Sequence, residues 1–431
     1  MKRFFLLLAF SLALIAGTAI AWGQGTNIPP ILPDWNKAAG LDQVYDMSPK
    51  ALTPAPAGYK AVYISHYGRH GSRYAYTPRS YSIPLEMLQK GARHDNLTAR
   101  GRKLMEDLEA FWDRNRYRVG DLTPLGWKQH EWIAETMVKS FPTVFRKGST
   151  VDACSSASNR SILSMTAECT TFGRVAPQIS VYAHQSMLDV QATRPNEGKN
   201  PFVYKGPELK LPYSESSEDF FLRHFPQYNE VLARMFKDPE AAMRGRNAYD
   251  NFFYFYMLVA GMNSLPEEER IDMDGLLTPE EYAILWETDN YERFREYYPY
   301  QTPCSSIVDD IIAKADARLN AGSTGADLRF GHDHVLMTLL MIMDIDGSGT
   351  VPENQDDIGR YFRSYLSPMA TNIQLVFYAP VCKRNADTLV KVLLNGEETN
   401  FGKLPSVSGP YYSWPQLRDY LNSRTALFVT R

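Results

Sequence analysis

The chain has 431 residues, with 46 lysines and arginines against 49 aspartates and glutamates, and a formal net charge of −3. This length is enough for one large domain or two, with a substantial core. A mildly acidic balance gives no general electrostatic attraction to nucleic acid or to anionic membranes, so affinity for an anionic ligand must come from a local basic cluster.

The first residues have the pattern of a secretory signal peptide. Lys2 and Arg3 precede an apolar run over residues 4–20, which ends in the small-residue pattern of 19–21, as is typical of such a segment. A retained membrane anchor is the alternative, but no charged stop-transfer segment follows. We therefore expect the signal peptide, residues 1–24, to be removed, with the exact bond left open, and the mature protein to be periplasmic or secreted, without a membrane association after cleavage.

Three short β-type runs each break into a polar loop that a helical pattern follows. The runs cover residues 61–65, 150–155 and 328–331, and the polar positions after them include His70, Arg160 and Asp333. In open α/β sheets, ligands bind at the carboxyl ends of the strands, where helix amino termini present their N–H groups. The three loops are therefore expected to meet at one site.

The remaining patterns are mostly helical. Helices are expected over 97–116, over 124–141 with Thr123 as N-cap, and in five stretches without a strand signal over 217–225, 228–236, 239–262, 279–291 and 305–319. Two further strands are expected over 373–378 and 388–394, and a short helix after Pro415. These patterns indicate an α/β fold with a mostly parallel central sheet flanked by helices, formed by residues 25–203 and 323–431. Residues 204–322 are expected to form an all-helical inserted cap domain.

The strongest chemical signal is the segment Arg69-His70-Gly71-Ser72-Arg73. Two guanidiniums that flank a histidine at this spacing can bind phosphate oxygens, while the imidazole ring attacks phosphorus. The alternative is a surface loop with two solvated arginines and an ordinary histidine. The position directly after a strand and a glycine favours the phosphate site.

The order of motifs resembles that of the histidine acid phosphatases, the exported branch of the histidine phosphatase superfamily. The resemblance covers nearly the whole mature chain and rests on the Arg69–Arg73 segment, residues 122–126 (LTPLG), Arg160 after the second strand, and Gly331-His332-Asp333. It implies an exported phosphatase that cleaves phosphate monoesters through a phosphohistidine intermediate, without a metal or another cofactor. By the same resemblance, His70 is the nucleophile, Asp333 is the proton donor, and the phosphate is held by Arg69, Arg73, Arg160 and His332.

The substrate is expected to be a small phosphorylated molecule, and several alternatives stay open. A tyrosine directly after Arg73, as at Tyr74, resembles the pattern of the multiple inositol polyphosphate phosphatases. Those proteins differ, however, in that they typically carry His-Ala-Glu where this chain has His332-Asp333-His334. Phytate or another inositol polyphosphate is one candidate substrate, and a sugar phosphate such as glucose 1-phosphate is another. A non-catalytic binding protein for phosphorylated ligands would keep the arginines but would need neither His70 nor Asp333 for chemistry. A phosphomutase of the cytoplasmic branch would lack the signal peptide.

Other features carry less weight. The histidines next to the motifs, His66 and His334, are interpreted as structural. Two Asp-rich segments, 272–275 and 344–351, partly match calcium loops, but Gln355 stands where the second loop needs a bidentate carboxylate, so both are interpreted as polar turns. The disulfide pairing and the oligomeric state are left open. The cysteines are far apart and form no metal-type pair: Cys154, Cys169, Cys304 and Cys382.

Overall fold

The computed structural model describes residues 31–196, 206–207, 209–382 and 386–428. The expected signal peptide, residues 1–24, lies outside the described residues. Among the residues that are described, no helix combines the length and the apolar character that crossing a bilayer requires.

An eight-stranded mixed sheet forms the centre of one half of the molecule, with the strand order β3-β2-β4-β1-β5-β6-β7 and with β8 paired to β6. The strands are β1 (Tyr59–Arg69), β2 (Thr150–Ser155), β3 (Ser180–His184), β4 (Gly325–Gly331), β5 (Asn372–Pro380), β6 (Leu389–Leu394), β7 (Glu397–Glu398) and β8 (Tyr411–Ser413). Strands β1 to β4 are parallel, whereas β5 is antiparallel to both β1 and β6. The predicted fold class, an α/β fold with a mostly parallel central sheet, is confirmed.

The register of the parallel strands brings three carboxyl ends together. Arg69 at the end of β1 lies opposite Gly331 at the end of β4, and Ser155 at the end of β2 lies opposite Phe330. All of β4 and the last nine residues of β1 are buried, as expected for strands that are covered on both faces. The loops that follow these strands therefore start side by side.

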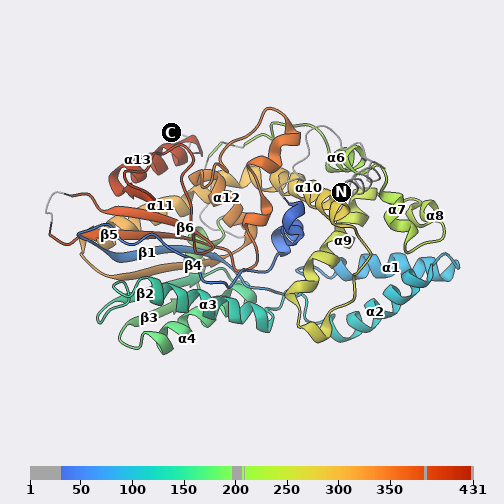
Figure 1. The fold of residues 1–431 in the computed structure, drawn as a ribbon, viewed down its shortest axis with the longest axis horizontal. Coiled ribbons are helices and arrows are strands. Elements are labelled where there is room, and N and C mark those ends of the chain that lie inside the picture. Colours follow the sequence, from blue (N-terminus) through green and yellow to red (C-terminus); the bar gives the residue numbers. More distant parts are fainter. Residues whose placement is uncertain (1–30, 197–205, 208, 383–385, 429–431) are drawn as a thin grey trace, which may run out of the picture.

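Helices cover both faces of the sheet (Figure 1). On one face, α3 (Pro124–Ser140) and α4 (Asn159–Val175) pack against each other and share a hydrophobic cluster with β2 and β4. On the other face lie α11 (Gln301–Asn320), α12 (Asp333–Met343) and α13 (Trp414–Thr425). Helix α3 begins as predicted, because Pro124 is its first residue and the Thr123 side chain accepts a hydrogen bond from the N–H of Gly126.

A helical region forms the other half of the molecule (Figure 1). Its helices are α1 (Arg79–Arg93), α2 (Ala99–Asn115), α6 (Ser217–His224), α7 (Tyr228–Ala233), α8 (Pro239–Met243), α9 (Ala248–Gly261) and α10 (Pro279–Tyr297). Helices α1 and α2 share a hydrophobic cluster with α9 and α10, so the helical region draws on two segments of the chain. Helix α11, which the sequence places in the cap, packs against the sheet instead. The domain boundaries at 204 and 322 stay a prediction.

The single helix expected over 239–262 is wrong, because the structure has α8 and α9 with a break between them. Gly245 lies in the break with a φ of +75°, a backbone conformation that continues no right-handed helix. Asn247 then caps α9 by accepting a hydrogen bond from the N–H of Asp250.

Short helical turns complete the described chain. They are the 3-10 turns η1 (Leu32–Asp42), η2 (Met187–Asp189), η3 (Met262–Ser264), η4 (Glu267–Glu269), η5 (Tyr298–Tyr300), η6 (Gln355–Arg360), η7 (Ser364–Leu366) and η8 (Ala426–Phe428), together with the four-residue helix α5 (Val190–Thr193).

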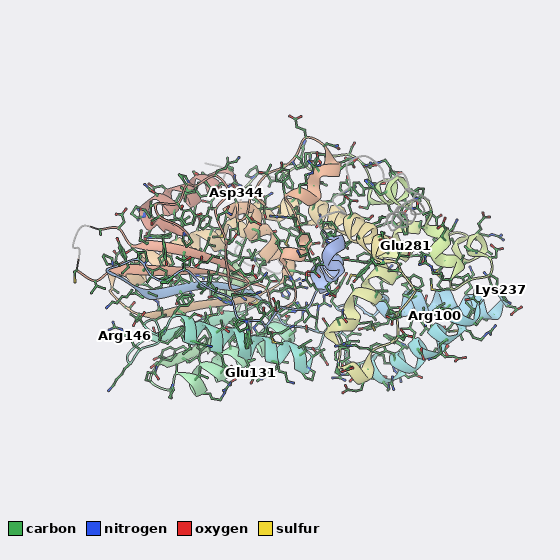
Figure 2. The ribbon with its side chains drawn as sticks, viewed as in Figure 1. Arg100, Glu131, Arg146, Lys237, Glu281 and Asp344 are labelled. Carbon is green, nitrogen blue, oxygen red and sulfur yellow. The ribbon has the colours of Figure 1, made fainter. Side chains whose placement is uncertain are left out.

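The two Asp-rich segments are polar turns in which several acceptor atoms are bound by protein groups. In the first, Arg100 donates to the carbonyl oxygens of Asp272 and Asp274, and Glu281 pairs with Arg234. In the second, the Asp344 carboxylate accepts hydrogen bonds from the N–H of Gly349 and the hydroxyl of Tyr420. Figure 2 labels Arg100, Glu281 and Asp344 on their different elements.

Candidate active site

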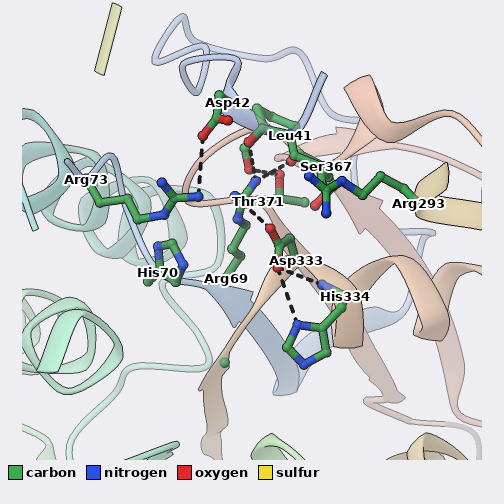
Figure 3. Close-up of polar contacts among 12 residues, drawn as sticks. Leu41, Asp42, Arg69, His70, Arg73, Arg293, Asp333, His334, Ser367 and Thr371 are labelled. Carbon is green, nitrogen blue, oxygen red and sulfur yellow. Dashed lines mark hydrogen bonds and ion pairs between the residues drawn. The ribbon is translucent and has the colours of Figure 1, made fainter. Parts of the chain in front are cut away.

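One cleft collects most of the residues that the motifs single out. It has a volume of about 330 Å³ and lies where the carboxyl ends of β1, β2 and β4 meet the helical region. Of the six predicted site residues, five line it: His70, Arg73, Arg160, His332 and Asp333. The sixth, Arg69, is fully buried and lies next to Asp333 (Figure 3).

The loop after β1 is held tightly against the helices of the sheet domain. The N–H of Gly71 donates to the Ser164 hydroxyl on α4, and the N–H of Ser72 donates to the Gln129 amide oxygen on α3. A Cβ at Gly71 would lie 2.4 Å from the Gly126 carbonyl oxygen, and a Cβ at Gly126 would lie 2.3 Å from the Ser72 carbonyl oxygen. The two glycines of the sequence motifs are therefore needed for one close approach of backbone to backbone.

We expect Gly126→Ala to destabilise the protein and to displace the His70 loop. The added methyl group meets main-chain atoms that cannot move aside, and overpacking of this kind costs about 1–3 kcal/mol. The measurement is the melting temperature, with Gly173→Ala as a control, because Gly173 lies in α4 with open space at its Cβ position. An equal melting temperature for the two variants would contradict the close-approach explanation.

The contacts of the His70 ring indicate which of its two nitrogens carries the proton. Its Nδ1 lies 3.0 Å from the Gly71 carbonyl oxygen, which only accepts hydrogen bonds, so Nδ1 carries the proton and Nε2 keeps its lone pair. Burial holds the pKa of His70 well below its ordinary value, and the charges of Arg160, Arg69 and Arg73 lower it further. The ring is therefore neutral in mildly acidic solution, as a nucleophile requires.

The guanidiniums around His70 have different partners. Arg73 pairs with the buried Asp42, with 3.4 Å between Nη2 and Oδ1. Among the described residues, Arg160 and Arg194 have no carboxylate partner, although both line the cleft. Burial, followed by the charge of Arg73, lowers the pKa of Arg160 to about 10, so its charge persists at any physiological pH. The positive charge of these guanidiniums makes the cleft suited to binding an anion.

Arg69 is the residue that the structure places away from the cleft surface. Its Nη1 donates to the carbonyl oxygens of Leu41 and Ser367, and its Nη2 lies 3.1 Å from Asp333 Oδ2 (Figure 3). The buried guanidinium of Arg69 therefore holds one oxygen of the Asp333 carboxylate in place. Burial raises the pKa of Asp333, but Arg69 and His334 outweigh it and hold that pKa well below its ordinary value.

His332 occupies the N-cap position of helix α12, directly after β4, and lies near His70. Its Nε2 is 2.9 Å from the Ser156 hydroxyl, and its ring centroid is 5.6 Å from that of His70. Burial holds the pKa of His332 well below its ordinary value, and Arg160 lowers it further. The ring is therefore neutral and suited to a hydrogen bond with a bound ligand.

Several residues of the cleft carried no motif in the sequence. Arg194 follows α5, Arg293 lies on α10 between its partners Asp289 and Glu296, and Tyr297 ends that helix. His334 also lines the cleft and contacts Asp333, so its interpretation as a purely structural residue is incomplete. His66, in contrast, is buried against Phe330, where burial lowers its pKa to about 3. Within the described ranges, no group of three or more His, Cys, Asp or Glu residues is placed to hold a metal ion.

The sequence matches no protein-family model and no curated protein. The structure, however, is similar to that of the multiple inositol polyphosphate phosphatase of Bifidobacterium longum in complex with inositol hexasulfate. The TM-score is 0.72 and the identity 19%, over 89% of this chain and 97% of that chain. It is also similar to the phytase of D. castellii, with a TM-score of 0.65 and 15% identity over 95% and 89% of the two chains. A phytase of Hafnia alvei gives 0.51 and 10% over 88% and 100%. These similarities confirm the fold that the resemblance to the histidine acid phosphatases implies.

Proposed function

We propose that the protein is an exported histidine acid phosphatase, which hydrolyses phosphate monoesters through a phosphohistidine at His70. The observation that carries the proposal is the placement of His70, whose Nδ1 faces the Gly71 carbonyl oxygen, among the guanidiniums of Arg73 and Arg160 at the carboxyl ends of three strands. Phosphoryl transfer needs little more from a protein than placement and stabilisation of charge on the transferring oxygens. The fold shared with phosphatases adds support.

The reaction has two steps. In the first, Nε2 of His70 forms a bond to phosphorus while the bond between phosphorus and the ester oxygen breaks, and that oxygen receives a proton through Asp333. In the second, water attacks the phosphohistidine, gives its proton to Asp333, and releases phosphate and free His70. Arg73, Arg160 and His332 bind the phosphate oxygens, and Arg69 positions Asp333. Every bond made to His70 is broken again, so the protein is unchanged after a cycle.

Two observations support a proposal for the substrate class: the ligands of a solved neighbour, and Arg194, which has no carboxylate partner among the described residues. The B. longum enzyme was solved with inositol hexasulfate and with phosphate. In this cleft, Arg194 adds a guanidinium to those of Arg73 and Arg160. We propose inositol polyphosphates, phytate included, as substrates, with a sugar phosphate as the alternative. Comparing kcat/KM for phytate and for glucose 1-phosphate decides between them, and a higher value for glucose 1-phosphate excludes the first.

The proposed function is tested by phosphate release from p-nitrophenyl phosphate at mildly acidic pH, with and without EDTA. We expect turnover that the chelator does not change, because the proposed groups are all side chains of the chain itself. A protein that binds phosphate but turns over neither this ester nor phytate would instead be a binding protein for phosphorylated ligands. Periplasmic or secreted localisation is tested by fractionating the native cells.

A further inference from the structure

His334 is held against the carboxylate that is proposed to protonate the leaving group. Its backbone N–H donates to Asp333 Oδ1 at 2.9 Å, and its ring Nδ1 lies 3.4 Å from the same oxygen. The other carboxylate oxygen is fixed by Arg69. Figure 3 shows Asp333 between these two partners. The two oxygens of Asp333 thus have different environments, one facing the Arg69 guanidinium and one facing the His334 imidazole.

The His334 ring is packed rather than free to turn. It lies parallel to the His332 ring, with an angle of 8° and 5.5 Å between centroids, and it contacts the rings of Tyr297 and Tyr300. The side chain is 13% exposed, and its buried Nε2 has no hydrogen-bond partner in the described part of the chain. The titratable and charged groups around the ring are Asp333, His332, Tyr297 and Tyr300, with Arg69 beyond Asp333 and Arg194 beyond His332.

Asp333 alone is poorly suited to hold the proton that it must deliver. A general acid works best when its pKa lies near the operating pH, whereas Arg69 holds the pKa of Asp333 well below its ordinary value. At mildly acidic pH the carboxylate is ionised. A histidine, in contrast, ordinarily changes charge between about pH 5 and 8.

We propose, on the basis of the proposed function, that His334 stores the proton that Asp333 passes to the leaving oxygen. In the first step, Nδ1–H of His334 protonates Oδ1 of the Asp333 carboxylate, and the ester oxygen takes this proton from Oδ1 as its bond to phosphorus breaks. His334 becomes neutral and Asp333 ends as a carboxylate. In the second step, the attacking water loses a proton to Asp333, which returns it to Nδ1. One proton therefore leaves and re-enters the His334–Asp333 pair in each cycle.

The test replaces His334 by glutamine and compares two esters. Glycerol 2-phosphate releases an alkoxide that needs a proton, whereas p-nitrophenyl phosphate releases a stable phenolate. We expect kcat for glycerol 2-phosphate to fall by about a hundredfold, the low end of what positioned proton transfer contributes, and kcat for p-nitrophenyl phosphate to fall far less. The exposed His94, at the end of α1, gives the control variant His94→Gln, which keeps both rates.

Two further measurements separate proton storage from a structural role. In His334→Ala, added imidazole should restore turnover of glycerol 2-phosphate but have little effect on p-nitrophenyl phosphate. The alkaline limb of the pH–rate profile with glycerol 2-phosphate should move to lower pH in His334→Gln, because His334 then no longer supplies a proton to Asp333. If His334 merely lowered the pKa of Asp333, the limb would move to higher pH instead.

Equal losses on both esters, or a limb that moves to higher pH, would overturn the inference. Neither result affects the proposed function, because the variant would still form the phosphohistidine. Failure of the wild-type protein to hydrolyse either ester would instead contradict the proposed function itself.

Discussion

Replacing His70 by alanine is expected to abolish turnover while phosphate binding persists. Removal of a covalent nucleophile costs at least about 10⁴-fold in kcat, whereas Arg73, Arg160 and His332 remain in the cleft to hold the anion. The measurements are kcat with p-nitrophenyl phosphate and calorimetric titration with inorganic phosphate. His94→Ala is the control, since that exposed residue lies outside the cleft.

The pH profile of the wild-type protein provides a second view of the same residue. Because burial and the neighbouring arginines hold the pKa of His70 well below its ordinary value, the ring stays neutral as the pH falls below 6.5. Activity should therefore persist into acidic solution, without a loss near pH 6.5. Undiminished kcat in His70→Ala would rule out the ring as nucleophile.

Asp333→Asn is expected to slow esters with poor leaving groups far more than activated esters. Asparagine keeps the shape of the side chain but has no proton to transfer, so kcat for glycerol 2-phosphate should fall by about 10²- to 10³-fold. The fall for p-nitrophenyl phosphate should be much smaller, because its leaving group needs no proton. The ratio of the two kcat values is the measurement, and an unchanged ratio would argue against the acid role.

The same variant has a stability consequence with a defined pH window. The ion pair with Arg69 lowers the pKa of Asp333, so it stabilises the folded protein above the unfolded pKa, near 3.9. That contribution is lost as the pH falls through the lower folded value. Asp333→Asn should therefore lower the melting temperature at pH 6, and the difference from wild type should shrink below about pH 4.

The parts of the fold that the sequence predicts are those with strong local patterns. Strands β1, β2 and β4 contain short β-type runs that are followed by polar loops, and five of the six predicted site residues line one cleft. The sequence does not predict strand β3, because four of its five residues are exposed and no alternation of apolar and polar residues marks it. Strands β7 and β8 are only two and three residues long, and pairing with β6 defines them.

The missing parts of the site depend on tertiary contacts. Arg194 and Arg293 come from segments with no motif, and the packing of α10 against η1 and α12 brings Arg293 to the cleft. The membership of α1 and α2 in the helical region is likewise a matter of which cluster their apolar faces join. The contact between His334 and Asp333 could not be predicted, since neighbouring residues in a sequence need not have contacting side chains.

The most direct test of the account is to identify the side chain that becomes phosphorylated. Radiolabelled p-nitrophenyl phosphate is mixed with the protein and quenched within milliseconds in alkaline denaturant, which preserves phosphohistidine, and the labelled peptide is located by mass spectrometry. We predict label on His70, with none in His70→Ala. Label on another side chain, or steady turnover without any labelled peptide, would contradict the covalent mechanism.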